Sequence, residues 1–596
     1  MVYETSYASA TKPFSPDPKR GKWEKPTDYI FACFGLALKL DIFEISYWFF
    51  FNIGFVGMLP YFLYMVIYLV PILVVHSFMG QFSSSGFIAA FRLAPLFKGM
   101  GYVSVFLTFS TLIYYSMFVA IPLLFIINSF RPTLPWSCEG LKSWHNRTDE
   151  YPTLCHPSIY KQHKNFTLGV EPPSRIYFNY LRQDYFNANE RFDLSRPLLG
   201  LFTLAWALVA LIFYNFSEPA KFGKCIRYMV IATMVLVVVC FVRFLYLPGS
   251  HTLLWRYITP NTNDFSEGVY STFIMALQAF GAGWGSVIAL SSFNGFKTDI
   301  MSYSWIISFG QIFIYIMFGL VSFMLEQYYT GKADLLLFHH INISDNIVFH
   351  KIMSFWLLFL SSASALNTLS WPNLWTFIYY SMLLMASLTV ITTQLFTVLQ
   401  SLFDEFETLK ERKQKVTFGT IFGLAICSFF FCTEHGSFYF AILGVDIIFA
   451  HSLLHLLLLL VVLWIYGQKR FQRDIEFMLG QPFASWKVFI LRYTAPIVFV
   501  ICLILGIIEC IRGHSFFMEV FLVLGIILVV LPFLAIPGYG YYYLKQSPGT
   551  FLERLKRSCR PTDWYPVEMK HRQHYGDLVG NIEMTDHLCN GTEEEN

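Results

Sequence analysis

Residues 101–130 read GYVSVFLTFSTLIYYSMFVAIPLLFIINSF, a run without one Asp, Glu, Lys, Arg or His. As a helix this run is about 45 Å long, whereas the hydrocarbon core of a bilayer is about 30 Å thick. Residues 225–247, CIRYMVIATMVLVVVCFVRFLYL, form a second run of the same kind, with arginines only near its ends. Such runs are typical of helices that cross a membrane.

The composition of the whole chain indicates the same class. Hydrophobic residues make up 55% of the 596 residues and charged residues 14%, whereas a typical soluble domain has about 25% charged residues. A chain this apolar needs lipid as its solvent. The net charge of +3 is too small to indicate nucleic-acid binding. We therefore predict an all-α polytopic membrane protein with lipid around it and no nucleic-acid partner.

About twelve apolar runs are long enough to span a bilayer. They are approximately Tyr29–Phe51, Ile53–Met79, Gly101–Phe130, Leu198–Phe216, Cys225–Leu247, Val269–Leu290, Tyr303–Leu325, Leu374–Phe403, Val416–Phe431, Phe438–Tyr466, Phe489–Cys510 and Phe516–Tyr543. The expected organisation is an N-terminal tail over 1–26, a twelve-helix domain over 27–545 and a C-terminal tail over 546–596.

Lysine and arginine gather in five segments: the N-terminal tail, the links after the fourth, eighth and tenth spans, and the start of the C-terminal tail. With an even number of spans these segments share one side, which the positive-inside rule assigns to the cytoplasm. We expect a multi-pass protein of the plasma membrane with both termini in the cytoplasm.

The loops 131–197 and 326–373 then face outward. They carry the glycosylation sequons at Asn146, Asn165 and Asn342. In the first loop Cys138 and Cys155 are the cysteine pair, and the oxidising outer compartment favours a disulfide between them.

A series of short motifs follows the chain in order. They are R-x-x-W at Arg20–Trp23, L-P-Y at Leu59–Tyr61, G-Q-F at Gly80–Phe82, L-F-K-G-x-G-Y at Leu96–Tyr102, I-Y-Y at Ile113–Tyr115, L-P-W at Leu134–Trp136, G-A-G-W-G at Gly281–Gly285, S-S-F-N at Ser291–Asn294 and L-F-D-E-F at Leu402–Phe406. Each is weak alone, but together they resemble the family of sodium-coupled neurotransmitter and amino-acid transporters.

This resemblance implies two inverted five-helix repeats and two further helices. The first and sixth helices of such a fold are broken near the midplane, where freed backbone groups and helix ends bind substrate and sodium. The glycine-rich string 281–285 would form the sixth-helix break, although glycines can also serve only close helix packing. We favour the broken helix at this position.

The first helix departs from the family pattern. Lys39, Asp41 and Glu44 place three charges near the middle of a spanning helix, where each costs a few kcal/mol unless paired or wetted. Asp41 takes the place of the family's sodium-binding Asn and Glu44 that of an outer gate Arg. If a one-residue deletion lies later, Ile42 and Ile45 take those places. Lys39 either forms a structural ion pair with one of the acids or replaces a sodium charge beside the substrate.

Two of the ion sites implied by the resemblance have lost ligands. Ala279 stands where a hydroxyl residue binds the first sodium, and Met275 stands where a Gln helps bind chloride. A methyl group or a thioether cannot coordinate a hard cation or donate to an anion. We expect the first sodium site and the chloride site to be lost or rebuilt, so that sodium dependence is reduced or absent and chloride dependence is doubtful.

The second sodium site is better preserved. By resemblance, its candidate ligands are the carbonyls of Gly35, Leu38 and Ala386, the hydroxyl of Thr389 and, as a further candidate, Asp41. Val390 replaces one ligand hydroxyl. The alternative for Thr389 is a hydrogen bond back to its own helix.

The resemblance also assigns residues to the two gates and to the substrate pocket. Arg20 and Asp404 stand in the ion-pair positions of the cytoplasmic gate, whereas Gly444 replaces the acidic partner on the outer side, facing Glu44. By position, the candidate substrate-binding residues are Ala37, Lys39, Asp41, Tyr115, Gln278, Gly281, Trp284 and Gln394.

One histidine pair stays outside this scheme. His451 and His455 are four residues apart on the tenth span, which is also a spacing of metal ligands. With no third ligand nearby, we expect a polar pair that is shielded from lipid.

The sequence thus predicts a secondary active transporter of small organic solutes, such as an amino acid, an amine or a neurotransmitter-like compound. It would work by alternating access around a midplane site. No Walker A string is present, so an ATP-driven pump is not expected, and no catalytic group can be assembled, so neither is an enzyme. The alternative is a transport-incompetent scaffold or regulator of the same fold, which the eroded ion sites favour and the retained gate opposes.

Overall fold

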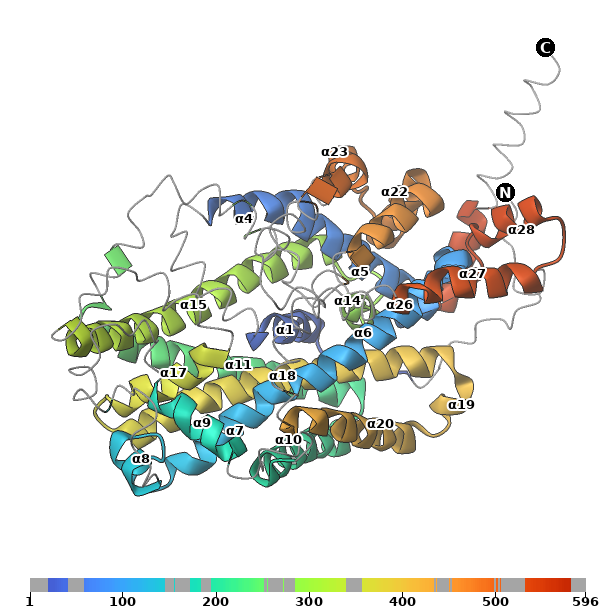
Figure 1. Ribbon diagram of the computed structural model, residues 1–596. Coiled ribbons are helices and arrows are strands. Elements are labelled where there is room, and N and C mark those ends of the chain that lie inside the picture. Colours follow the sequence, from blue (N-terminus) through green and yellow to red (C-terminus); the bar gives the residue numbers. More distant parts are fainter. Residues whose placement is uncertain are drawn as a thin grey trace, which may run out of the picture.

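A computed structural model describes residues 20–40, 58–144, 155, 172–183, 194–250, 254–255, 269, 272, 285–338, 356–433, 436, 450, 453–497, 500–501, 504 and 531–579. The regular elements in these ranges are helices (Figure 1). They are α1 (Pro26–Ala37), α4 (Leu59–Tyr64), η1 (Met65–Leu69), α5 (Val70–Ser83), η2 (Ala89–Leu93), η3 (Pro95–Phe97), α6 (Gly99–Tyr115), α7 (Met117–Ser129), α8 (Cys138–Trp144), α9 (Pro173–Gln183), α10 (Arg196–Asn215), α11 (Pro219–Leu245), α14 (Ser286–Ser291), α15 (Ile300–Phe338), α17 (Trp356–Asn367), α18 (Pro372–Glu405), α19 (Glu407–Lys410), α20 (Lys413–Ser428), η6 (Phe429–Cys432), η7 (Val461–Gly467), α22 (Gln468–Leu479), α23 (Ser485–Phe489), η8 (Ile490–Thr494), α26 (Leu531–Phe533), α27 (Ala535–Gln546) and α28 (Phe551–Ser558).

Eight stretches of the described chain are long and apolar enough to cross a membrane. They are Leu59–Ser83, Pro95–Ser129, Arg196–Asn215, Pro219–Leu245, Ile300–Tyr329, Pro372–Glu405, Lys413–Cys432 and Leu453–Leu479. They correspond to eight of the twelve predicted spans, so the all-α polytopic class is confirmed. The other four predicted spans lie partly outside the described residues, and the count of twelve stays a prediction.

Helix α18 lies at the centre of the molecule. In its most apolar window 89% of the residues are buried, compared with 33% for α11 and for α20. Helix α1 packs against α18, α11, α15 and α14, and Figure 1 shows α1 and α14 in the interior of the bundle. Because protein surrounds α1, its irregular backbone is shielded from lipid, as a spanning chain requires.

Helices α4, η1 and α5 form one continuous spanning unit with a wider, π-helical turn in the middle. Pro71, at the start of α5, has no N–H to donate to the preceding turn, and a π-helical segment absorbs such a missing bond. Gly80 near the end of this unit packs against α14, since a Cβ there would lie 1.9 Å from the carbonyl oxygen of Ile288. Residues 59–83 are therefore fixed tightly to the short helix that follows Gly285.

The outer loop expected over 326–373 contains regular structure. Helix α15 continues to Phe338, beyond the expected span end at Leu325, and α17 occupies Trp356–Asn367. Helix α17 packs against α15, α9 and α18, so part of this loop belongs to the folded body of the protein.

Candidate functional site

Helix α1 is interrupted inside the bundle. It ends at Ala37, and Leu38 and Lys39 are not helical. The backbone N–H of Leu40 donates to the hydroxyl of Tyr115 at 2.5 Å, so a side chain from the end of α6 replaces a helical partner. Ala37, Leu38 and Leu40 are fully buried. The predicted interruption of the first helix is present, and it frees backbone groups in the protein core.

The candidate second sodium site lies where α1 meets α18. A Cβ on Gly35 would lie 3.0 Å from Cγ2 of Thr389, so the two helices touch at this point. Ala386 and Thr389 are fully buried. The Thr389 hydroxyl donates to the Met385 carbonyl at 2.6 Å, which is the back-bond considered as the alternative. This bond uses only the hydroxyl proton, so the oxygen lone pairs remain for a cation.

The donor types named for the second sodium site fit sodium by their chemistry, because hard cations prefer carbonyl and hydroxyl oxygens. At the contact itself, the Thr389 atom nearest to the Cβ position of Gly35 is the methyl carbon Cγ2. The further candidate Asp41 lies outside the described residues, as does Glu44. Sodium ligation by this set stays a prediction.

Lys39 lies in the non-helical stretch, and 7% of it is exposed. Its ammonium group is therefore held inside the protein beside the interruption. The expected pairing with Asp41 or Glu44 stays a prediction, because both acids fall outside the described ranges.

The sixth predicted span is described from Gly285 onward, so its predicted break at 281–284 lies outside the described residues. Gly285 has φ of +80° and directly precedes α14. A Cβ at this position would lie 2.5 Å from Cβ of Phe87, so both the backbone angle and the space require glycine. Gln278, Gly281 and Trp284 lie outside the described residues, and their placement in the pocket remains a prediction.

Gln394 lies on α18 between the two interrupted segments. On one side, the hydroxyl of the neighbouring Thr393 would lie 3.3 Å from a Cβ placed on Gly35 of α1. On the other side the hydroxyls of Thr397 and Ser286 are 3.2 Å apart. Gln394 is fully buried, and among the described residues neither its amide oxygen nor its amide nitrogen has a hydrogen-bond partner. A buried amide left unpaired costs about 1–3 kcal/mol per group, so it is a strong candidate for contact with a polar ligand.

A buried charge pair joins Arg20 to Asp404 at the end of α18. Arg20 donates to both carboxylate oxygens of Asp404, at distances from 2.8 to 3.1 Å. The guanidinium also donates to the carbonyl and hydroxyl of Ser292 and lies 4.2 Å from the ring centre of Phe293. The N–H of Gly86 donates to Asp404 at 2.7 Å. Arg20 and Asp404 are therefore bonded, and the pair ties together four separate segments of the chain. Its role as a gate stays a prediction.

The sequence matches the profile of the Sodium:neurotransmitter symporter family over residues 20–547. This chain belongs to that family. The sodium- and chloride-dependent glycine transporter 1 of Xenopus laevis is 24% identical over 93% of this chain and 89% of its own length. The sodium- and chloride-dependent neutral and basic amino acid transporter B(0+) is 25% identical in Homo sapiens, over 95% of this chain and 93% of its own, and 24% in Mus musculus, over 96% and 93%. These relatives are transporters and not enzymes.

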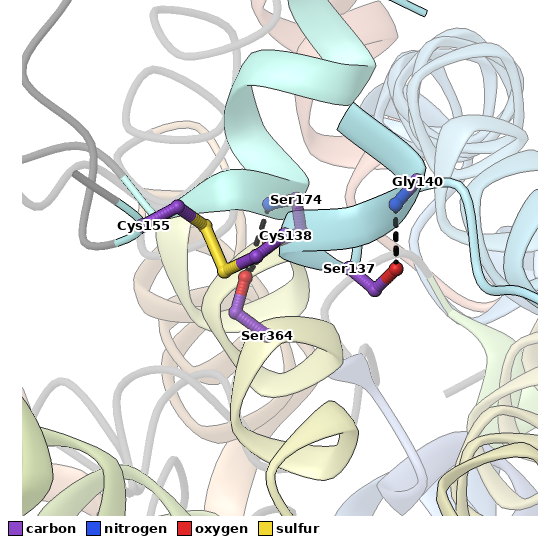
Figure 2. The surroundings of a disulfide bond; sticks show 6 residues. All are labelled: Ser137, Cys138, Gly140, Cys155, Ser174 and Ser364. Atoms are coloured by element: carbon purple, nitrogen blue, oxygen red, sulfur yellow. Dashed lines mark hydrogen bonds between the residues drawn. A yellow bond between two sulfur atoms is a disulfide. The ribbon is translucent and has the colours of Figure 1, made fainter. Parts of the chain in front are cut away.

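The predicted disulfide of this symporter-family chain is formed. Cys138 and Cys155 are bonded, and Cys138 begins α8 (Figure 2). Nearby, the N–H of Ser174 at the start of α9 donates to the Ser364 hydroxyl of α17 at 3.0 Å. The disulfide therefore lies where the two outer loops meet. The sequons at Asn146, Asn165 and Asn342 lie outside the described residues.

The C-terminal tail packs against α5 and α22 of the symporter body, which the sequence analysis did not predict. Trp564 is fully buried and stacks on Phe82 of α5, with ring centres 5.1 Å apart. The Trp564 indole and the Tyr575 hydroxyl donate to Asp474 of α22, at 3.3 and 3.0 Å. Glu568 pairs with Lys22, two residues from the gate arginine. The adjacent aromatic residues Trp564 and Tyr565 in an otherwise polar tail were the feature of the sequence that could have indicated this docking.

Arg92 connects the tail to the end of α5. Its guanidinium donates to the carbonyls of Ser83 and Asp563 at 3.0 and 3.1 Å, and its own carbonyl accepts from the Thr562 N–H at 2.9 Å. Burial lowers the pKa of Arg92 to about 10. The side chain therefore stays charged at neutral pH, and it holds the tail in place.

Proposed function

We propose that this chain is a carrier of amino acids or related amines that works by alternating access around the interruption of α1. One observation carries the proposal: buried Leu38 and Lys39 leave the helix while Tyr115 binds the next backbone N–H. Freed backbone groups and a hydroxyl suit the carboxylate and ammonium of a small zwitterion. The Arg20–Asp404 pair supports the proposal, because a gate has a use only where a solute passes.

We infer that the substrate is an amino acid from two lines of support. The relatives are named for glycine and for neutral and basic amino acids. Gln394 adds a buried amide without a described partner beside the pocket, and it suits a substrate with a polar group beyond its carboxylate. The protein is proposed to act in the plasma membrane, with both termini in the cytoplasm and glycans on the outer loops.

Sodium coupling is proposed to be weaker here than in the relatives. Oxygen donors remain at the α1–α18 contact, whereas Ala279 and Met275 replace polar ligands at the first sodium site and the chloride site. Lys39 is buried at the interruption, and its ammonium group is proposed to take the place of a sodium ion beside the substrate. Replacing Lys39 by glycine is expected to abolish uptake or to restore sodium dependence.

Uptake into vesicles tests these proposals. The full chain is reconstituted and offered labelled glycine, leucine and lysine, with sodium exchanged for choline and chloride for gluconate. Uptake that persists at reduced rate in choline supports a weakly coupled carrier, and full loss supports ordinary symport. The control is Lys39→Arg, which retains the charge. No uptake of any of the three amino acids, by protein that is folded and correctly inserted, would overturn the carrier proposal in favour of a scaffold.

A further inference from the structure

Two histidines and a tyrosine form a buried polar cluster away from the site described above. His76 of α5 and His455, two turns before η7, lie with ring centres 5.3 Å apart at 80° to each other. Nδ1 of His455 shares a hydrogen bond with the hydroxyl of Tyr68. His76 and His455 are 1% and 2% exposed. The cluster joins two spanning stretches that are far apart in sequence.

His76 does not fit a purely structural role. Neither of its ring nitrogens has a hydrogen-bond partner among the described residues. An imidazole always carries at least one N–H, and an unpaired buried polar group costs about 1–3 kcal/mol. Its sequence neighbours Ile72, Leu73, Val75 and Met79 are buried apolar side chains. A phenylalanine would pack here without that cost, so His76 points to a ligand.

A proton is the ligand that fits this cluster best. Imidazole nitrogens are poor ligands for sodium, which prefers oxygen. Among the described residues no group of three His, Cys, Asp or Glu could hold a metal ion. A proton needs neither a cavity nor a carboxylate partner, and histidine is the side chain that binds and releases one near neutral pH. Ionisable side chains inside a membrane commonly form proton relays.

The cluster is mechanically connected to both interrupted helices. On the same helix, Gly80 packs against the backbone of α14. The adjacent Ser77 hydroxyl lies 2.6 Å from the Tyr29 hydroxyl of α1. A charge placed on His76 would therefore act on the elements that build the proposed substrate site.

The elements that pack against α5 carry several other titratable groups, and α14 has none. Besides Tyr68 of η1 they are Arg92 of η2, then Tyr303, Tyr315, Glu326, Tyr328, Tyr329, Lys332 and Asp334 of α15, and Asp28, Tyr29 and Cys33 of α1 beyond Ser77. Helix α22, whose Phe471 contacts Phe78, adds Lys469, Arg470, Arg473, Asp474 and Glu476. Arg92 is fixed in the cytoplasmic contacts described above. Tyr68 is the residue in this set that is seen to bond a histidine of the cluster.

We propose that His76, with His455 and Tyr68, is a proton-binding site, and that this proton serves as a coupling cation of the carrier. A ring nitrogen of His76 accepts one proton and becomes an imidazolium, whose N–H groups need polar or aqueous partners. The closed apolar arrangement disfavours this charged form. Proton binding thus favours a state in which the helices of His76 and His455 separate. The coupling part of this inference rests on the proposed function, whereas the proton site itself does not.

A first experiment measures thermal unfolding of the full chain in lipid nanodiscs, from about pH 8 to about pH 6, the range where histidine titrates. A neutral buried histidine stabilises the fold above its unfolded-state pKa, and this stability is lost as the pH falls. The wild-type midpoint is expected to fall with pH, and His76→Gln to remove most of that fall. His574→Gln, at an exposed histidine of the C-terminal tail, is the control. If the His76→Gln protein does not fold, the Tyr68→Phe variant is measured in its place. It should also change the slope of the unfolding midpoint against pH. A slope that is unchanged in the folded variant overturns the proton site.

A second experiment tests coupling. Liposomes that contain the protein and an internal pH dye receive glycine, leucine or lysine under an imposed pH gradient. Substrate-dependent proton flux that is lost in His76→Gln, while His574→Gln keeps it, supports the proposal. Sodium-driven uptake without proton flux overturns coupling and leaves the carrier proposal standing. Absence of all uptake overturns the carrier, and the unfolding experiment still decides whether the proton site exists.

Discussion

The Arg20–Asp404 pair, which we propose as the cytoplasmic gate, allows a quantitative prediction. Asp404→Asn preserves the shape of the side chain and leaves an oxygen for the N–H of Gly86, but it removes the charge that Arg20 meets at 2.8 Å. The two side chains are only 9% and 7% exposed. Removing one partner of a buried pair costs about 3–5 kcal/mol. Because the amide keeps some bonds, we expect a smaller cost of ~2–3 kcal/mol, which is roughly a 30- to 150-fold shift toward the open state.

The native thiol of Cys33 reports this shift. Cys33 is fully buried on α1, so a cytoplasmic thiol reagent reaches it only when α1 moves. In a background where the other free cysteines are replaced, the alkylation rate in Asp404→Asn is expected to rise by one order of magnitude or more. Glu411→Gln, a change of an exposed acid on the same cytoplasmic side, should leave the rate unchanged. Equal rates in wild type and Asp404→Asn would refute the assignment of this pair as a gate.

Three further changes have expected outcomes. Tyr115→Phe leaves the N–H of Leu40 without its described acceptor and should raise the KM for uptake by about tenfold, since one such bond is worth about 1–1.5 kcal/mol; an unchanged KM would count against the pocket. Gly80→Ala should lower the thermal midpoint, because its Cβ meets a carbonyl oxygen at 1.9 Å, whereas Gly423→Ala, with nothing within 4 Å, should not. Trp564→Ala should destabilise the protein by about 3 kcal/mol and expose the tail to protease; a protected tail would contradict the observed docking.

The spans could be predicted from sequence because lipid leaves the backbone few choices. A chain in hydrocarbon must satisfy its own N–H and C=O groups, so an apolar run becomes a helix over nearly its whole length. The run predicted at Leu374–Phe403 is helix α18 at Pro372–Glu405. The interruption at Leu38 and Lys39 is different, because neither periodicity nor composition marks it. Only the resemblance to a family with broken helices indicated it.

Contacts between distant parts of the chain were beyond the reach of sequence patterns. His455 was noted only for its spacing to His451, while its structural neighbour is His76 on α5. The buried stacking of Trp564 on Phe82 was also missed. Both contacts depend on which helices the topology brings together, and local propensity does not encode that. The gate pair was found because two short motifs, each recognisable alone, supplied its two partners.

The described contacts between elements are of two chemical kinds: close packing of apolar backbone segments, and contacts between charged groups. Inside the membrane, α5 and α14 are joined where Gly80 brings two backbones together, and water cannot substitute for such dispersion contacts. At the cytoplasmic end the joints are charged. Asp404 receives Arg20 and Gly86, and Arg92 holds Ser83 and the tail. Water can replace charged partners at small net cost once a crevice opens. We propose that such a bundle moves as a unit where its backbones are in contact and opens where its contacts are charged, as the proposed carrier would require.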